Sequence, residues 1–341
     1  MNRKTKLLSG ILIGMMALSL SACVDQHPEK EEPDAVSEET RIVATSNATL
    51  QICDRLDLDL VAIPTTSGEV PKRYQDLPEI GTAMAPDAEK IALLEPTDII
   101  GPAALSENLE SVYQGAGVPY TFIDLQSVEG MYESIEQLGE KYHKEDKAEK
   151  LIKGYEKEMK DFQKRVKGKE APKVLVLMGL PGSYIECTPH SYVGSLVELA
   201  GAECVADDEF MNFVSWNTEE LLKLDPDIIL LTAHGLPDLA MDMFTKEFHT
   251  NDIWQHFRAV QEGHVYQLDY NTFGMSCNFT WPKALNTLEK IFYGTGYESY
   301  DTTPMAEEEF EAQQAEQGGS QEEVPEDYEE MTGNLLNKDS Y

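Results

Sequence analysis

The sequence predicts an α/β protein of two Rossmann-like lobes joined by a single long helix. Short apolar strands alternate with helical segments in both halves of the chain, a rhythm that builds mostly parallel sheets covered by helices. One long amphipathic stretch, residues 145–167, interrupts the rhythm, which then restarts. Residues 86–101 of the first half also align with residues 217–231 of the second half. Two related lobes on either side of one helix would leave a cleft between them.

The first 40 residues precede the predicted fold. Residues 1–22 have the form of an export signal, in which the basic run NRKTK precedes an apolar run too short to span a membrane comfortably. The tetrad LSAC (20–23) resembles the lipobox of bacterial lipoproteins. That resemblance implies a lipid, including palmitate, on Cys23 as the new N-terminus; an ordinary cleaved signal peptide is the alternative. Residues 23–40 are polar and acidic, which predicts a flexible tether.

The first lobe is expected over residues 41–142. Asn47 is a candidate N-cap for the first helix, residues 47–58. The predicted strands of this lobe are residues 41–46, 60–64, 97–102 and 119–124.

The linking helix is expected over residues 143–168, because apolar residues recur there at helical spacing between Lys and Glu. This stripe consists of Ala148, Leu151, Ile152, Tyr155, Met159, Phe162 and Val166. The second lobe follows over residues 169–296, with predicted strands at 173–179, 227–233 and 264–269.

The internal repeat gives each lobe a short helix that stops before a proline and leads into a buried strand. Glu89 precedes Pro96 by seven residues, and Glu219 precedes Pro226 by the same number. The two glutamates are therefore expected at equivalent positions in the two lobes.

The C-terminal segment, residues 297–341, is expected to be an acidic, disordered tail, since residues 301–341 hold thirteen acidic residues and one basic residue. The whole chain carries 62 acidic and 27 basic residues, for a formal charge of −35. That balance argues against nucleic acid and against docking on anionic lipid.

Four cysteines follow Cys23, and none has metal-type spacing. Cys53 and Cys204 are expected to be buried thiols, whereas Cys187 and Cys277 lie near predicted loops. One disulfide is possible in an exported protein, but the sequence does not pair them.

Ligands of open α/β sheets sit beyond the carboxyl ends of the strands. His234 follows a buried strand and precedes a turn, so its imidazole is a candidate ligand, although a loop histidine bonded to a carbonyl is the simpler reading. Met84 stands in a loop framed by Gly and Pro, where a methionine most often only fills space. His190 is the main competitor. A thioether and an imidazole on opposite walls suit haem iron better than zinc or calcium.

No hydrolase, metalloprotease or phosphate-binding motif occurs in the sequence. We therefore expect a binding protein and not an enzyme.

Four long stretches carry a more specific resemblance: RYQDLPEIGTAMAPDAEKI (73–91), PKVLVLMGLPGSY (172–184), NTEELLKLDPDIIL (217–230) and EFHTNDIWQHFRAVQEGHVYQL (247–268). Over residues 41–293 the chain resembles the haem-binding lipoproteins of iron-regulated surface determinant (Isd) type ABC importers. The resemblance implies a class III substrate-binding protein, whose backbone between the lobes is helical. It is expected to be a monomer on the outer face of the cell membrane, lipid-anchored and of Gram-positive origin.

The resemblance also implies roles for individual residues. Met84 in the G-x-x-M loop and His234 in the H-G-x-P turn would be the axial ligands of haem b, the transported ligand. Glu89 and Glu219 would dock onto arginines of the permease, while solvated helix-start carboxylates are the alternative for both. Upstream surface proteins would supply the haem.

Pocket and propionate contacts are expected at strand ends and at the start of the first helix, whose N–H groups attract anions. The candidates are Ser46, Asn47, Ser67 and Tyr184. A ferric siderophore or a corrinoid in the same fold is the alternative cargo.

Overall fold

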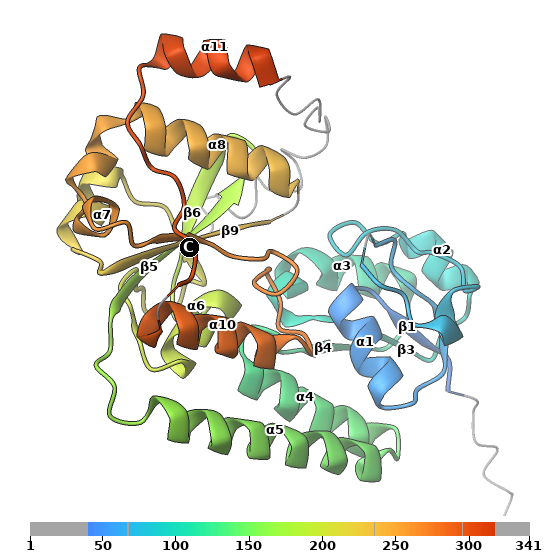
Figure 1. Cartoon of the computed structure of the whole chain (residues 1–341). Helices are drawn as coiled ribbons and strands as arrows, with labels where there is room; N and C mark the ends of the chain where they lie inside the picture. The colour runs from blue at the N-terminus through green and yellow to red at the C-terminus, as the bar shows by residue number, and fades with distance from the viewer. Residues whose placement is uncertain (1–39, 67, 235, 295, 318–341) are drawn as a thin grey trace, which may run out of the picture. The chain divides into compact units, whose positions relative to one another are not determined.

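Figure 1 shows a computed structural model of the chain, which describes residues 40–66, 68–234, 236–294 and 296–317. The expected signal peptide, tether and lipidated Cys23 lie outside these residues, as do Ser67 and the chain beyond Gln317. Both lobes belong to one unit that begins at Thr40.

The first lobe is built on a four-stranded sheet in the order β2-β1-β3-β4. Every pairing in it is parallel, as the alternation of strands and helices predicts. Its strands are β1 Ile42–Ala44, β2 Leu60–Ala62, β3 Asp98–Pro102 and β4 Tyr120–Ile123. Its helices are α1 Asn47–Arg55, η1 Lys72–Tyr74, α2 Ala88–Leu93, η2 Ala103–Leu105 and α3 Ser106–Ala116.

The second lobe holds a six-stranded sheet in the order β10-β9-β5-β6-β8, with β7 paired to β5. It is mixed, since β6 runs antiparallel to both β5 and β8. Its strands are β5 Lys173–Leu180, β6 Ser183–Cys187, β7 Glu203–Cys204, β8 Phe213–Val214, β9 Ile228–Ala233 and β10 Val265–Gln267. Its helices are α6 Tyr192–Leu199, α7 Thr218–Lys223, α8 Pro237–Thr250, η3 Asp252–His256, α9 Arg258–Gln261 and α10 Trp281–Tyr293.

Two helices in sequence, α4 (Val128–Lys141) and α5 (Glu145–Val166), carry the chain from the first sheet to the second. The predicted apolar stripe of α5 faces the core: Ala148, Met159 and Phe162 are buried, and the other four members pack against the same cluster. The linking helix expected over residues 143–168 is present, with the bounds Glu145–Val166.

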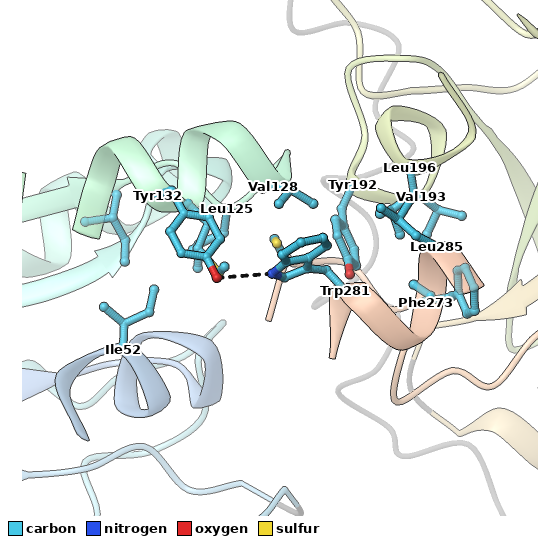
Figure 2. Close-up of a cluster of buried hydrophobic side chains, with 14 of the residues drawn as sticks. Ile52, Leu125, Val128, Tyr132, Tyr192, Val193, Leu196, Phe273, Trp281 and Leu285 are labelled. Carbon is cyan, nitrogen blue, oxygen red and sulfur yellow. Dashed lines mark hydrogen bonds between the residues drawn. The ribbon is translucent and has the colours of Figure 1, made fainter. Parts of the chain in front are cut away.

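One core cluster contains side chains from both lobes. Figure 2 shows Trp281 of α10 at its centre, with Tyr132 of α4 on one side and Tyr192 of α6 on the other. The indole Nε1–H of Trp281 donates a hydrogen bond of 3.2 Å to the Tyr132 hydroxyl (Figure 2). The Tyr132 and Tyr155 rings also stack, with centroids 4.4 Å apart. Aromatic packing of this kind joins α4, α5 and α10.

The internal repeat of the sequence corresponds to a repeated helix-strand unit in the structure. Both α2 and α7 are single short helices followed by a parallel strand, β3 and β9 respectively. Each ends at a non-glycine residue with left-handed backbone, Glu95 at φ 46° and Asp225 at φ 45°, directly before the proline. The repeated sequence therefore produces the same helix stop in both lobes.

Two local predictions were wrong. The N-cap of α1 is Ser46 and not Asn47, because the Ser46 hydroxyl accepts the Thr49 N–H. Tyr184, expected beyond the end of a strand, instead belongs to strand β6, because Gly182 at φ 79° closes a tight hairpin after β5. A Pro-Gly pair ahead of an apolar run indicates such a turn.

The start of the C-terminal segment also differs from the expected disordered tail. Residues 297–306 run along the second lobe and lead into α11 (Glu307–Gln317), which lies beside α8 (Figure 1). The Tyr300 N–H bonds the Val265 carbonyl at 2.7 Å, and Phe310 is only 7% exposed. Tyr300 and Phe310 hold this segment against the second lobe. The high acidic content of the segment gave no indication of these contacts.

Cys53, Cys187, Cys204 and Cys277 are free thiols and all are buried, including the two expected near loops. Burial raises the pKa of Cys53 and Cys204 to about 12. Within the described ranges, no helix is both long and apolar enough to cross a bilayer.

Candidate functional site

An open pocket of about 140 Å³ lies between the loops of the two sheets. The first lobe contributes Ser46, Ala83, Met84, Pro102, Ala104, Leu105 and Gln126, and the second contributes Ser191, Tyr192, Asn212, Phe213, His234, Met275 and Ser276. Among these described residues none is Lys, Arg, Asp or Glu. The pocket is therefore mostly apolar and offers one imidazole and two thioethers as donors to a metal.

Met84 stands at the tip of a tight loop. Gly81 and Pro86 close the loop through a β-bridge, and the Ala85 N–H bonds the Thr82 carbonyl at 3.2 Å. Gly81 adopts φ 99°, and a Cβ at this position would lie 2.6 Å from the Ala85 carbonyl oxygen. Glycine is thus required for the loop that places the Met84 side chain in the pocket.

His234 follows β9 directly. Its backbone N–H bonds the Gly179 carbonyl of β5 at 2.9 Å, so the sheet holds it in place. Leu236, at φ 34°, and Pro237 then turn the chain into α8. Burial lowers the pKa of His234 below its ordinary value of 6.5. The imidazole is therefore neutral at neutral pH, which is the form that binds a metal.

The structure brings Met84 and His234 into one pocket from opposite lobes, as the sequence predicts. The competitor His190 is not among the pocket residues; its Nε2 lies 3.1 Å from the Asp208 carbonyl oxygen on the surface. No group of three or more His, Cys, Asp or Glu side chains within the described ranges could hold a bare metal ion.

The other residues predicted at the pocket differ in where they lie. Ser46 lines the pocket while its hydroxyl caps α1. Asn47 is outside the lining, and its Nδ2 donates to Thr66 Oγ1 at 3.2 Å. Ser67 lies outside the described residues.

Tyr184 is not at the pocket, contrary to the prediction. It lies on β6 with its hydroxyl 3.2 Å from Thr218 Oγ1, and its ring packs near Phe244 and Trp254. Because β6 is a strand and not a loop, this side chain joins the packing of the second sheet instead of facing the cleft.

Several pocket residues were not predicted. Gln126 follows β4, so the rule that ligands sit at strand ends could have identified it. Tyr192 begins α6, and Phe213 begins β8, which is too short to recognise from its sequence. Met275 lies in the segment between β10 and α10, where no periodic pattern in the sequence indicates it.

Glu89 and Glu219 lie in the first turns of α2 and α7, and both are exposed. The Asp87 side chain caps α2 by accepting the N–H groups of Glu89 and Lys90. In α7 Asn217 and Glu220 form a capping box. In each helix another residue satisfies the backbone N–H groups, so the two glutamate carboxylates face outward from equivalent positions.

The model of the family described as periplasmic binding protein matches residues 42–272. The high-affinity heme uptake system protein IsdE of Staphylococcus aureus (strain bovine RF122 / ET3-1) is 38% identical over 280 residues, 82% of this chain and 96% of the relative. A structure of S. aureus IsdE complexed with heme is similar at 40% identity and TM-score 0.71, over 75% of this chain and 99% of that one. An ABC transporter substrate-binding protein from Listeria monocytogenes EGD-e is similar at 43% identity, with the same TM-score of 0.71 and the same 75% and 99% coverage.

The predicted fold class agrees with these relatives, and the resemblance seen in the sequence is confirmed. The aligned relatives are covered almost to their full length while about a quarter of this chain lies outside the structural matches. The chain belongs to the periplasmic binding protein family, in the group of class III substrate-binding proteins.

Proposed function

We propose that this chain binds haem and delivers it to the permease of an ABC importer. The observation that carries the proposal is the pocket, where Met84 of one lobe and His234 of the other line one uncharged, largely apolar space. A thioether and a neutral imidazole are axial ligands of haem iron in proteins. The 40% identical relative with heme bound supports the same cargo.

In this proposal Met84 and His234 occupy the two axial positions of the iron, and the porphyrin lies against the apolar lining. With both positions filled, no site remains for oxygen or substrate at the iron. The protein then carries haem b as cargo and performs no catalysis.

The haem propionates would meet the start of α1. Ser46 lines the pocket there, and the unbonded N–H groups of a helix N-terminus attract anions. Asn47, the first residue of α1, and Ser67 complete the proposed propionate contacts.

Glu89 and Glu219 would dock the two lobes onto the permease, one on each subunit. Their equivalent positions in the repeat and their exposure support this role. Lipidation of Cys23 would hold the protein at the extracytoplasmic face of a Gram-positive cell membrane, where upstream surface proteins supply haem.

The test is a titration of the full chain with haem, followed by absorption spectroscopy, for wild type, Met84→Ala and His234→Ala. We expect a six-coordinate low-spin spectrum in wild type. His234→Ala should lose it, Met84→Ala should change it, and each variant should bind at least about tenfold more weakly, equal to about 1.4 kcal/mol. Met243→Leu on α8, outside the pocket lining, is the control. Tight binding of a ferric siderophore or a corrinoid, with only the broad spectrum of free haem, would refute the proposal.

A further inference from the structure

A second methionine, Met275, lines the same pocket as Met84 and His234. It is partly buried and packs against the core cluster that joins the lobes. Like Met84, it stands in a loop beside glycine and not on the apolar stripe of a helix. The sulfur of Met275 is thus a second soft donor in a pocket that offers few polar groups.

The loop that carries Met275 is fixed to the second lobe. Thr232 Oγ1 of β9 donates a hydrogen bond of 2.7 Å to the Phe273 carbonyl, and the Phe273 N–H bonds the Asp269 carbonyl at 2.9 Å. Phe273 is 1% exposed and lies beside Leu285 in the core (Figure 2). Thr232 lies on β9, two residues before His234, which directly follows this strand. Strand β9 therefore holds both His234 and the loop that carries Met275.

After Met275 the loop also contacts the first lobe, where the Arg55 guanidinium lies over the Phe279 ring. The Cys277 N–H bonds the Leu125 carbonyl, just beyond β4, at 2.7 Å. Cys277 is fully buried, as is Tyr192 beside it in the pocket wall. Met275 thus sits between two buried residues, Phe273 and Cys277, which fix its backbone on both sides while its side chain faces the pocket.

Met84 belongs to the first lobe, where its loop is hydrogen-bonded through Ile80 to Ile63 and through Gly81 to Thr65. We propose that Met275 is a second iron ligand, which takes the axial position of Met84 when the first lobe withdraws during haem loading or release. This inference rests on the proposed haem function. With this exchange the second lobe alone would supply both iron ligands, His234 and Met275.

The exchange is chemically balanced. The bond between iron and the Met84 sulfur breaks as the bond between iron and the Met275 sulfur forms. Both thioethers are neutral donors of one electron pair, so the charge and oxidation state of the iron do not change and no proton moves. The soft sulfur of methionine is suited to such a replacement.

The experiment compares haem complexes of the full chain carrying Met84→Leu, Met275→Leu or both, with Met243→Leu as the control. Leucine preserves volume but has no sulfur, and thermal unfolding verifies that each variant is folded. Absorption and magnetic circular dichroism report whether a thioether binds the iron. We expect a low-spin, thioether-ligated iron in Met84→Leu and a five-coordinate, high-spin iron in the double variant.

Release gives an independent measurement. With excess apomyoglobin as acceptor, Met275→Leu should lose haem at least about threefold faster than wild type, and Met243→Leu at the wild-type rate. A Met84→Leu complex that is already five-coordinate and matches the double variant overturns the inference, as does an unchanged release rate in Met275→Leu. If wild type itself shows no low-spin complex, the haem function has failed and not the role of Met275.

Discussion

His234 shows how burial prepares a side chain for its role. Removing an imidazole from water disfavours its charged form, which lowers the pKa of His234 below 6.5. The neutral ring keeps its lone pair for a metal at pH values where an exposed histidine is already partly protonated.

We therefore predict that haem affinity is independent of pH from about pH 8 down to 6.5, and falls only at lower pH. Below the lowered pKa, each further pH unit should weaken binding about tenfold, because one proton must leave before the iron binds. Haem titrations across this range measure the effect. A decline that begins above pH 6.5 would contradict the assigned direction.

The same residue affects the stability of the haem-free protein. Its pKa is 6.5 in the unfolded chain and lower in the folded one, so below pH 6.5 the unfolded state binds more protons. Stability should accordingly begin to fall as the pH drops through 6.5, and His234→Gln should remove part of that dependence. Denaturant unfolding at a series of pH values tests this.

Capping decides where the first helix begins. The hydroxyl oxygens of Ser46 and Thr49 lie 2.6 Å apart, and the Thr49 N–H donates to Ser46 Oγ at 3.2 Å. Ser127 caps α4 in the same way, through the Gly130 N–H at 2.9 Å, but is not a pocket residue. The two serines thus form a matched pair that separates capping from binding.

We predict that Ser46→Ala and Ser127→Ala each lower the free energy of unfolding by about 1 kcal/mol. Only Ser46→Ala should also weaken haem binding, by about threefold to tenfold, because only Ser46 lies at the proposed propionate site. Chemical denaturation and haem titration of both variants provide the comparison. Equal haem affinities would remove Ser46 from the site.

The segment after α10 stabilises the second lobe. The Tyr300 hydroxyl lies 2.6 Å from Thr245 Oγ1, the His249 ring bonds the Thr303 carbonyl, and Phe310 packs beside His249. All of these contacts reach α8, the helix that begins just after His234. The segment thus braces α8 against the rest of the lobe.

Ending the chain after Gly296 should lower the melting temperature by roughly 5–10 °C, equal to about 2–3 kcal/mol. Ending it after Gln317 retains every described contact and should leave the melting temperature unchanged. Differential scanning calorimetry of both truncations distinguishes them. An equal loss in both would show that the described contacts contribute little.

The two lobes present one acidic residue each at equivalent positions, which makes docking a property of the whole molecule. Glu89 and Glu219 belong to different lobes, and neither has an ion pair with another described residue. Two charged contacts from two rigid lobes would fix the orientation of the protein on a two-subunit partner.

We predict that Glu89→Ala and Glu219→Ala leave haem affinity unchanged and lower haem uptake by cells about tenfold each, with a larger loss in the double variant. Glu107→Ala, an exposed first-turn residue of α3, is the control. Uptake of labelled haem in cells expressing each variant measures the effect. If both glutamate variants transport like the control, docking lies elsewhere.

The sequence by itself determined most of the parallel strands, the linking helix and the internal repeat, because each is a local pattern of apolar spacing or of a helix stop before proline. It also identified Met84 and His234 as pocket residues. Met84 stands in a loop framed by Gly and Pro, His234 directly follows a buried strand, and both match a specific family motif. The sequence did not predict the Ser46 cap, which lies one residue before the expected cap, or the β6 hairpin. The hairpin makes Tyr184 part of a strand, and this places its side chain away from the pocket.

Only the tertiary structure decided which distant residues share the pocket. Tyr192, Phe213 and Met275 reach it because long-range pairings, such as Thr232 with Phe273 and Cys277 with Leu125, bring their segments to the cleft. The ordered start of the acidic C-terminal segment likewise depends on the edge of β10 and the face of α8. Such contacts join residues far apart in the chain, so they leave no periodic trace in the sequence around them.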